Sequence, residues 1–571
     1  MKRTVLYSLL LSLALPAIGY AESQPKGNSS QIEIGGGVGA TDLLGIGYKG
    51  EYGDRLKLKP MFRFTGVNQN NSSEKEDASY SFTGIMPLSA NKNYGYESHS
   101  KIDNSGINLT YGLWADYRID PSNSLSAGIK GSLSRLDVDG DRTELLMVPV
   151  GQIPAPRCST VSNLSGYNHS NDLELSAGYH YTTKESSSFS DGFDFDYTFS
   201  RISDELKRDQ VIIGQVNFID FSKSNLHTEG VSQKHRLQGN WSSHFGVVKL
   251  NLGAFYEDRL LTSEDQQKFE GLNNPARGLE NLDEEFRHRY RTTGAYALAV
   301  SRIGKVSLSA RLEYDYTNME GHHLSDVLPT ASAVWNMNSS NRLSARYARR
   351  LIRPSLELLN PAKIVGTFSC DYGNEELIGM HVNNINLEHV LSLGKTSLNS
   401  SLTHIFANDG FNAIWMERNG IRNYTWGNEG KRRAYSLTEN FSVKPAESTH
   451  VNVSLNIIWD KRVADAIHMA KEHWGATAKL GLEQKLTKTT NLDLHGQYSE
   501  GNTVDLYSHE GRSLGAGATL RQSFGKDLQL SLSYDYHDHP KLVITQGAYT
   551  GSLHQREGSR HALSLNLVYK F

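Results

Sequence analysis

Residues 559–571 read SRHALSLNLVYKF, and from His561 onward large and small side chains alternate. Leucines and aromatic residues hold the odd positions up to Phe571, while the even positions are mostly small or polar. This is the pattern of a β-strand with one apolar face. It is long enough to cross a bilayer as a tilted strand, which takes ~9–11 residues. The alternative is an ordinary strand in a soluble β-sandwich, so the rest of the chain must decide.

The same alternation recurs as hairpins along the whole chain. Leu514 to Phe524 alternates, residues 525–527 form a turn, and Leu528 to Tyr536 alternates back. Further tight turns are predicted at residues 487–490 and near Pro445, Lys395, Ser339, Ile303, Phe245, Ser186, Pro121 and Gly53. If the first strand begins near Gln31, ten tight turns imply about 22 strands, and single-chain membrane barrels have an even number.

The other connections are predicted to be long, at residues 139–171, 261–288, 352–382, 409–432 and 539–558. Short turns on one side and long loops on the other are typical of outer-membrane barrels, with the short turns in the periplasm. Aromatic residues gather at strand ends, as at Tyr314, Tyr316, Trp335 and Trp241, where two interfacial girdles are expected. We therefore predict an all-β, transmembrane antiparallel β-barrel of about 22 strands.

The N-terminus predicts export. Lys2 and Arg3 precede an apolar stretch and a small-residue cleavage site, so we interpret residues 1–21 as a signal peptide. We expect a short N-terminal segment at residues 22–30 and the barrel at residues 31–571. The predicted location is the outer membrane of a Gram-negative bacterium. A terminal strand that closes on Phe571 resembles the assembly signal of such barrels.

Charge and motifs narrow the function. The net charge of −3 gives no indication of a nucleic-acid partner. No nucleophile elbow, phosphate loop or paired-carboxylate signature is found, so we predict no enzyme, no cofactor and no metal site. Histidines such as His473 and His509 fall in the predicted loops; we interpret them as solvated, and haem or metal capture is the alternative. Cys158 and Cys370 also fall in predicted outer loops; export allows a disulfide between them, and the sequence leaves the pairing open.

One stretch resembles a known family. Residues 345–361 read ARYARRLIRPSLELLNP and are followed by Gly373-Asn374 and a new strand at 384–393. This order is similar to the outer-membrane β-barrel family found at the C-terminal end of TonB-dependent receptors, most clearly over residues 200–450. The resemblance implies a receptor barrel for uptake. Such receptors usually carry a plug domain before the barrel, but here strands are expected from Gln31, so we expect the barrel to lack a plug of its own.

Three arginines of this stretch are candidates for the lumen. Arg342, Arg346 and Arg350 alternate with the outward residues Leu343, Ala345 and Tyr347. They can pair with plug carboxylates, line an anion-attracting pore, or form a charge ladder with acidic neighbours. Four further residues are interpreted as shaping the loop where this strand ends: Arg353, Pro354, Asn360 and Pro361.

The predicted function is substrate uptake or transport by a receptor-like barrel. Its expected partners are outer-membrane lipids, the barrel-assembly machinery, and a plug domain or surface lipoprotein supplied by another chain. Two alternatives stay open: a passive outer-membrane channel, and a binding or scaffold protein that the barrel anchors at the surface.

Overall fold

The computed structural model describes residues 29–570 with short internal gaps. The gaps are residues 39–41, 52, 54, 69–73, 84–92, 151–152, 184–190, 217–221, 272–279, 320–321, 367–368, 419–420, 466–467, 503–507, 539–541, 545–548 and 556–560. The predicted signal peptide, nearly all of the segment 22–30, and Phe571 lie outside the described residues.

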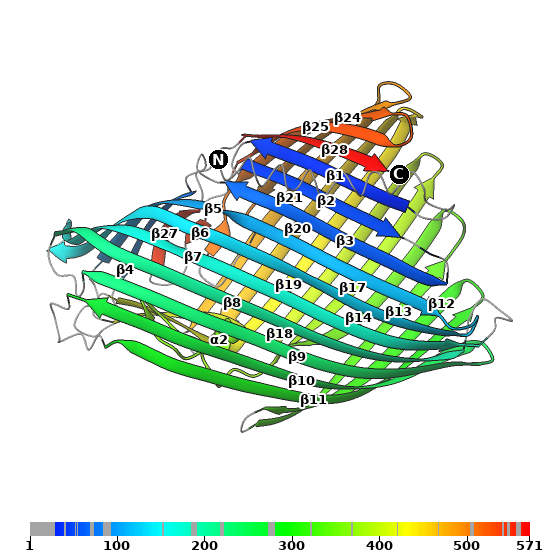
Figure 1. The fold of residues 1–571 in the computed structure, drawn as a ribbon, viewed down its shortest axis with the longest axis horizontal. Helices are drawn as coiled ribbons and strands as arrows, with labels where there is room; N and C mark the ends of the chain where they lie inside the picture. The colour runs from blue at the N-terminus through cyan, green and yellow to red at the C-terminus, as the bar shows by residue number, and fades with distance from the viewer. Residues whose placement is uncertain are drawn as a thin grey trace.

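A ring of 22 antiparallel strands forms the wall of the molecule (Figure 1). Each strand pairs with the next, and the last pairs with the first, so the sheet closes on itself. The strands are β1 (Ser29–Val38), β2 (Asp42–Glu51), β3 (Leu56–Asn68), β5 (Asn93–Arg118), β6 (Asn123–Val150), β7 (Ile153–Thr182), β8 (Gly192–Val216), β9 (Lys223–Phe245), β10 (Val248–Glu270), β11 (Leu282–Ile303), β12 (Val306–Met319), β13 (His322–Asn336), β14 (Asn341–Ile352), β17 (Met380–Leu393), β18 (Thr396–Arg418), β19 (Ile421–Ala446), β20 (Thr449–Ala464), β21 (Met469–Lys485), β22 (Thr490–Glu500), β24 (Ser513–Phe524), β25 (Leu528–His537) and β28 (His561–Lys570). The predicted fold class and strand number are confirmed.

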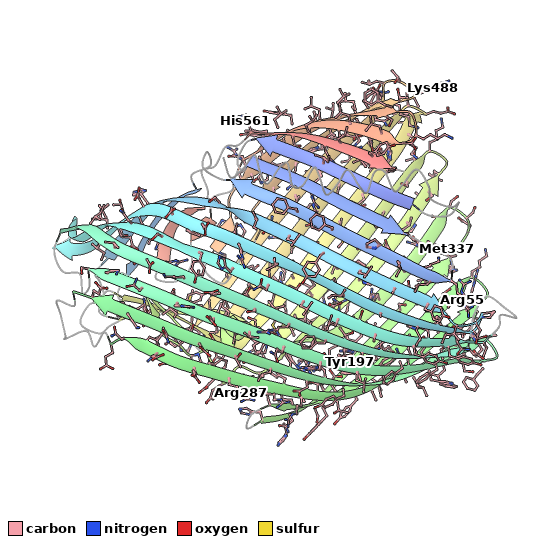
Figure 2. All side chains as sticks on the ribbon, viewed as in Figure 1. Arg55, Tyr197, Arg287, Met337, Lys488 and His561 are labelled. Carbon is pink, nitrogen blue, oxygen red and sulfur yellow. The ribbon has the colours of Figure 1, made fainter. Side chains whose placement is uncertain are left out.

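Every tight turn predicted from the sequence joins two neighbouring wall strands. These turns share one end of the barrel, which Figure 2 marks by Arg55, Met337 and Lys488. Gly246, Gly304, Gly394 and Gly525 adopt positive φ in four of them, a conformation that glycine reaches without steric cost. This end is the periplasmic one, because short turns face the periplasm in such barrels.

The opposite, extracellular end differs in part from the prediction. Residues 139–171, 261–288 and 409–432 are expected to be long loops, yet most of each belongs to wall strands that continue past the membrane, as in β6 and β7. The apolar face of each strand ends there because both faces of the extension contact water. The backbone hydrogen bonds between the strands nevertheless continue. Sequence alternation fails to detect such extensions.

The remaining elements lie in the extracellular connections. They are β4 (Glu74–Thr83), α2 (Leu356–Leu359), β15 (Ile364–Val365), β16 (Ser369–Asp371), β23 (Ser508–Glu510), β26 (Leu542–Ile544) and β27 (Tyr549–Gln555). β23, β26, β27 and β4 pair in that order and join the outer part of β5. Among the described residues, no helix is long and apolar enough to span a membrane.

The wall separates a lipid face from a polar lumen, and β12 shows this most clearly. Leu308, Leu312, Tyr314 and Tyr316 are 41–57 % exposed on the outer face. The alternate residues, from Ser309 to Thr317, face inward, and Thr317 is only 1 % exposed. Exposed apolar residues recur on other wall strands, among them Tyr197 in Figure 2. This band of apolar side chains is the surface that contacts lipid.

A loop fills part of the extracellular half of the lumen. Residues 353–379, between β14 and β17, contribute Leu359 and Leu377 to a buried cluster. Their partners are the inward residues Leu261 of β10 and Tyr290 of β11, together with Phe286 and Met319. We call residues 353–379 the inner loop. Because its apolar residues pack on the inner wall, it is held inside the barrel.

The outer face of β12 offers a test of the barrel in lipid. Leu312 lies midway along the apolar face, so Leu312→Lys places a charge near the bilayer centre, which costs about 2–4 kcal/mol. Ser309→Lys is the matched control, because Ser309 faces the lumen. Urea unfolding in lipid vesicles should show a large loss of stability for the first variant and a small one for the second. Equal losses would contradict this assignment of faces.

Candidate functional site

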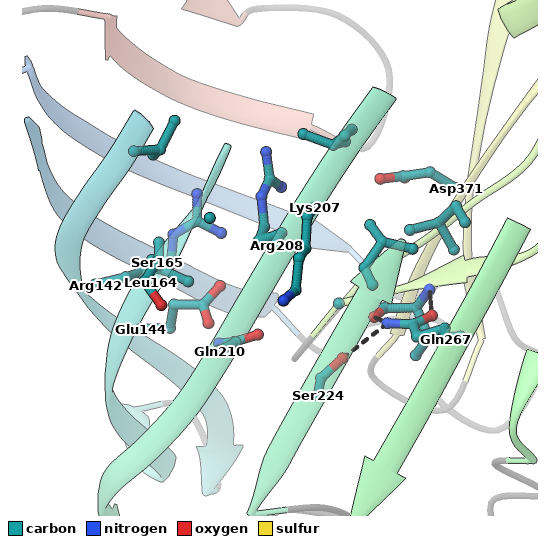
Figure 3. Close-up of a pocket in the computed structure, with 17 residues that line it drawn as sticks. Arg142, Glu144, Leu164, Ser165, Lys207, Arg208, Gln210, Ser224, Gln267 and Asp371 are labelled. Carbon is teal, nitrogen blue, oxygen red and sulfur yellow. Dashed lines mark hydrogen bonds between the residues drawn. The ribbon is translucent and has the colours of Figure 1, made fainter. Parts of the chain in front are cut away.

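A pocket of about 320 Å³ opens between the inner wall and the inner loop (Figure 3). Its wall side comes from the extracellular extensions of β6 to β10, and its loop side comes from residues 364–366 and Asp371. We call it the vestibule pocket. It lies at the extracellular end of the lumen.

Two arginines dominate the wall of the pocket. Arg142 lies on β6, and Arg208 lies on β8 between the inward residues Leu206 and Gln210. Burial lowers the pKa of the Arg208 guanidinium, and the positive charge of Arg142 lowers that pKa further. Two cations that raise each other's energy favour a bound anion, which would relieve both effects. Glu144, also in the pocket, adds an acceptor for ligand groups that donate hydrogen bonds.

Gln267 joins the wall to the inner loop. Its amide nitrogen donates to Ser224 Oγ at 3.0 Å and to the Val365 carbonyl at 2.7 Å. Its amide oxygen accepts from the Val365 N–H at 2.9 Å. The side chain thereby imitates a strand that pairs with Val365, and it is only 2 % exposed. The inner loop therefore borders the pocket in a fixed position.

The residues predicted to shape this loop lie at its base. Arg353 donates to Thr317 Oγ1 at 2.7 Å and lies 3.7 Å from Asp315. Asn360 donates to Asp265 Oδ2 at 2.7 Å, and its own oxygen accepts from the Ala362 N–H. Pro354 is fully buried next to Arg353, and Pro361 follows Asn360. These contacts attach the loop to the inner faces of β10 and β12.

The predicted arginine row lies on the lumen side of β14, away from the vestibule pocket. The Arg342 guanidinium lies 3.7 Å from the Glu388 carboxylate. Glu388 stands opposite Ser344 of β14, which faces inward as Arg346 does. Arg350 and Arg353 border a second cavity of about 330 Å³. Two ion pairs also line that cavity: Arg236 with Glu257 at 3.1 Å, and Arg311 with Glu313. A functional role for Arg342, Arg346 and Arg350 stays a prediction.

Cys370 is half-buried on β16 and forms no disulfide with any residue whose side chain the structure describes. Burial raises its pKa, and the neighbouring Asp371 carboxylate raises it further, so the unreactive thiol form is favoured. The side chain of Cys158 lies outside the described part of the chain. The structure thus does not show the disulfide, and the pairing stays a prediction.

Sequence reasoning missed the residues of the vestibule pocket. Arg142 and Gln267 fall in segments interpreted as loops, for which the sequence does not predict which side chains point into the lumen. The alternation of Leu206, Arg208 and Gln210 was the one signal available, because it continues the inward positions of a wall strand. It is weak without knowledge of the neighbouring strands.

Comparison with known proteins identifies one family and several solved structures that share the fold. The model of the family described as "Outer membrane protein beta-barrel family" matches residues 167–538. A search of curated proteins found no match.

Solved structures share the fold at low sequence identity. The ferric enterobactin receptor PfeA of Pseudomonas aeruginosa is 12% identical with a TM-score of 0.60, and the match covers 96% of this chain and 82% of that one. The copper transporter OprC is 10% identical with a TM-score of 0.64, covering 95% and 80%. The ferric yersiniabactin uptake receptor FyuA of Yersinia pestis is 11% identical with a TM-score of 0.58, covering 96% and 81%. These identities show the shared fold alone.

The attachment of the inner loop can be tested at Asn360. Asn360→Ala removes hydrogen bonds at 2.7 and 3.1 Å and leaves the buried Asp265 carboxylate short of a donor. Leaving a buried polar group unpaired costs about 1–3 kcal/mol. Limited proteolysis of the folded barrel should therefore cut the inner loop faster in this variant. Glu357→Ala, at an exposed position of the same loop, is the control; equal cleavage of both variants would refute this attachment.

Proposed function

This chain belongs to the outer membrane protein β-barrel family, and from that membership we propose that it takes up a small anionic ligand across the outer membrane. The ligand binds first in the vestibule pocket and then passes through the lumen. The proposal is one of transport rather than catalysis.

One observation carries the proposal. Arg142 and Arg208 line the same pocket at the extracellular mouth, where burial and the positive charge of Arg142 both act on the Arg208 guanidinium. A charge held in partly buried surroundings attracts an opposite charge more strongly than one in water. Guanidinium groups also donate paired hydrogen bonds to carboxylates and similar oxyanions.

The ligands named for the fold relatives support one class of ligand. Those receptors bind or import ferric enterobactin, ferric yersiniabactin or copper. A negatively charged complex of a metal with an organic chelator fits the arginine pair better than a free cation does. We therefore propose an anionic metal chelate as the ligand.

Controlled uptake needs a means of closing the barrel. A barrel of about 22 strands encloses a lumen that transporters close with a separate domain. The described residues form the wall and its connections, and they include no such domain. We propose that a plug domain supplied by another chain closes the lumen, and that a surface lipoprotein is a further candidate partner. Lipids surround the wall, and the barrel-assembly machinery would insert it.

A passive channel is the second candidate function, and the wide lumen favours it. Both functions place the ligand in the lumen, but only a receptor requires tight and selective binding at the vestibule pocket. A surface scaffold requires neither, since its partner would contact the extracellular extensions alone.

Ligand binding to the purified barrel tests the proposal. Ferric enterobactin and ferric citrate serve as anionic probes, with binding followed by quenching of tryptophan fluorescence. Each hydrogen bond to a charged group contributes about 1.5–3 kcal/mol. We therefore expect Arg142→Gln with Arg208→Gln to weaken binding by a factor of about ten or more.

Arg342→Gln is the matched control, because this arginine faces the lumen away from the pocket and pairs with Glu388. It should leave affinity nearly unchanged. Failure of the unaltered barrel to bind either probe, or equal affinities of the double variant and the unaltered barrel, would overturn the proposed ligand class.

A further inference from the structure

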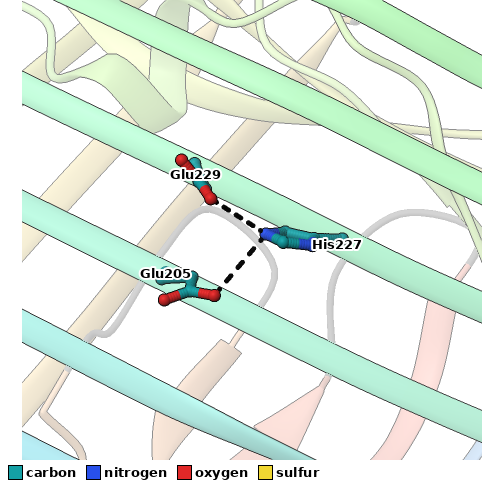
Figure 4. A group of neighbouring side chains, drawn as sticks. All are labelled: Glu205, His227 and Glu229. Carbon is teal, nitrogen blue, oxygen red and sulfur yellow. Dashed lines mark ion pairs between the residues drawn. The ribbon is translucent and has the colours of Figure 1, made fainter.

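Three ligand-type side chains converge on the outer face of the wall, beyond the apolar band (Figure 4). They are Glu205 on β8 and His227 and Glu229 on β9. On β8 the apolar band of the outer face runs from Phe193 to Phe199 and is followed by Arg201 and Ser203, so Glu205 lies on the extracellular extension of the strand. This cluster is separate from the vestibule pocket, which lies on the inner face.

The distances suit a shared cation. His227 Nε2 lies 3.7 Å from Glu205 Oε1 and 3.3 Å from Glu229 Oε1. One potential ligand atom from each residue lies within 4.8 Å of the other two. Two ligands bound to one zinc ion at ~2.0–2.2 Å in a tetrahedral arrangement are roughly 3.3–3.6 Å apart. Small side-chain rotations would therefore bring all three atoms to one ion.

The strand register brings like charges together. Glu205 stands directly opposite Glu229, and Glu229 stands opposite Glu264 of β10. Like charges directly opposite each other destabilise a sheet. The nearby Lys207 ammonium pairs with Asp209 at 3.8 Å. Among the described residues, the ion-pair contacts of Glu205 and Glu229 are with histidines. A bound cation would remove this repulsion.

The partners of Glu205 include a fourth candidate ligand. Tyr167 Oη donates to Glu205 Oε1 at 2.5 Å, which orients the carboxylate. His169 stands opposite Glu205 in register, and its Nδ1 lies 3.8 Å from Glu205 Oε2. Its ring stacks on Tyr167 with centroids 4.3 Å apart. The fourth position of a tetrahedral site is therefore within reach of His169.

The missing hydrogen bond of His227 Nε2 gives a second indication. Nε2 is inaccessible to solvent and has no hydrogen-bond acceptor among the described residues, although it points between two carboxylates. A buried polar atom without a partner is costly, and metal coordination is one way to satisfy it.

We propose that Glu205, His227 and Glu229 form a binding site for a divalent transition-metal ion of the Zn²⁺ type, with His169 as the fourth ligand. Imidazole nitrogen together with carboxylate oxygen suits zinc or copper. Calcium takes 6–8 oxygen ligands and magnesium requires an octahedral oxygen shell, which this set does not supply. The ion connects β7, β8 and β9 on their extracellular extensions. This inference does not depend on the proposed transport function.

Zinc binding to the full-length folded barrel in detergent tests the site. Titration calorimetry with zinc alone as the probe should show one tight site. Changes outside the ligand shell cost 10–100-fold in affinity, so loss of a ligand by His227→Gln should cost at least about tenfold. Tyr167→Phe keeps all ligands and should weaken binding less. A large excess of Mg²⁺ or Ca²⁺ should not displace the zinc.

His323→Gln is the matched control, because His323 also lies on the outer face but stacks on Tyr316 away from this cluster. It should leave the tight site intact. The shift in gel mobility between heated and unheated samples verifies that each variant is folded.

A second measurement tests whether the bound ion holds the strand extensions together. Zinc should slow proteolysis of the β8–β9 extensions in the unaltered barrel, EDTA should reverse this, and His227→Gln should abolish it. If folded barrel binds no zinc, or His227→Gln binds it as tightly as the unaltered protein, the proposal is overturned, and the cluster is then only a contact between side chains of neighbouring strands.

Discussion

The two ends of the chain meet in the wall, where β28 and β1 pair antiparallel from Gln31 with Lys570 to Val38 with Leu563. In hydrocarbon there is no water to satisfy an open sheet edge, so each backbone N–H and C=O needs a partner within the protein. This seam supplies those partners for the first and last strands. The lipid-facing apolar band and the polar lumen both depend on it, because an unclosed sheet would have neither an inside nor an outside.

Closure also explains where function concentrates. A ring of this size leaves a lumen too wide for wall side chains to fill, so connections such as the inner loop can fold inward and create pockets. Beyond the membrane the strands are wet on both faces, and charged residues occupy either side of the same wall. The inner side holds the arginine pair of the vestibule pocket, and the outer side holds the cluster at Glu205.

Much of the fold could be predicted from the sequence, because lipid imposes strict alternation on each strand and the periplasmic turns carry strong local signals. The tight turns and the inward direction of Arg342 follow from that pattern. The vestibule pocket and the cluster at Glu205 could not be predicted in the same way. Arg142 and Arg208 line one pocket, and Glu205 faces Glu229, only because of how different strands pair, which lipid no longer constrains outside the membrane.

The proposed transport function requires that the wall enclose a passage and that a separate plug close it. Single-channel conductance of the purified chain, refolded into a planar bilayer without any partner, tests it most directly. We expect large and stable openings, which an anionic metal chelate added on the extracellular side should reduce. A silent bilayer, with folding verified by the gel mobility shift, would mean that the chain's own loops fill the lumen and would contradict the claim.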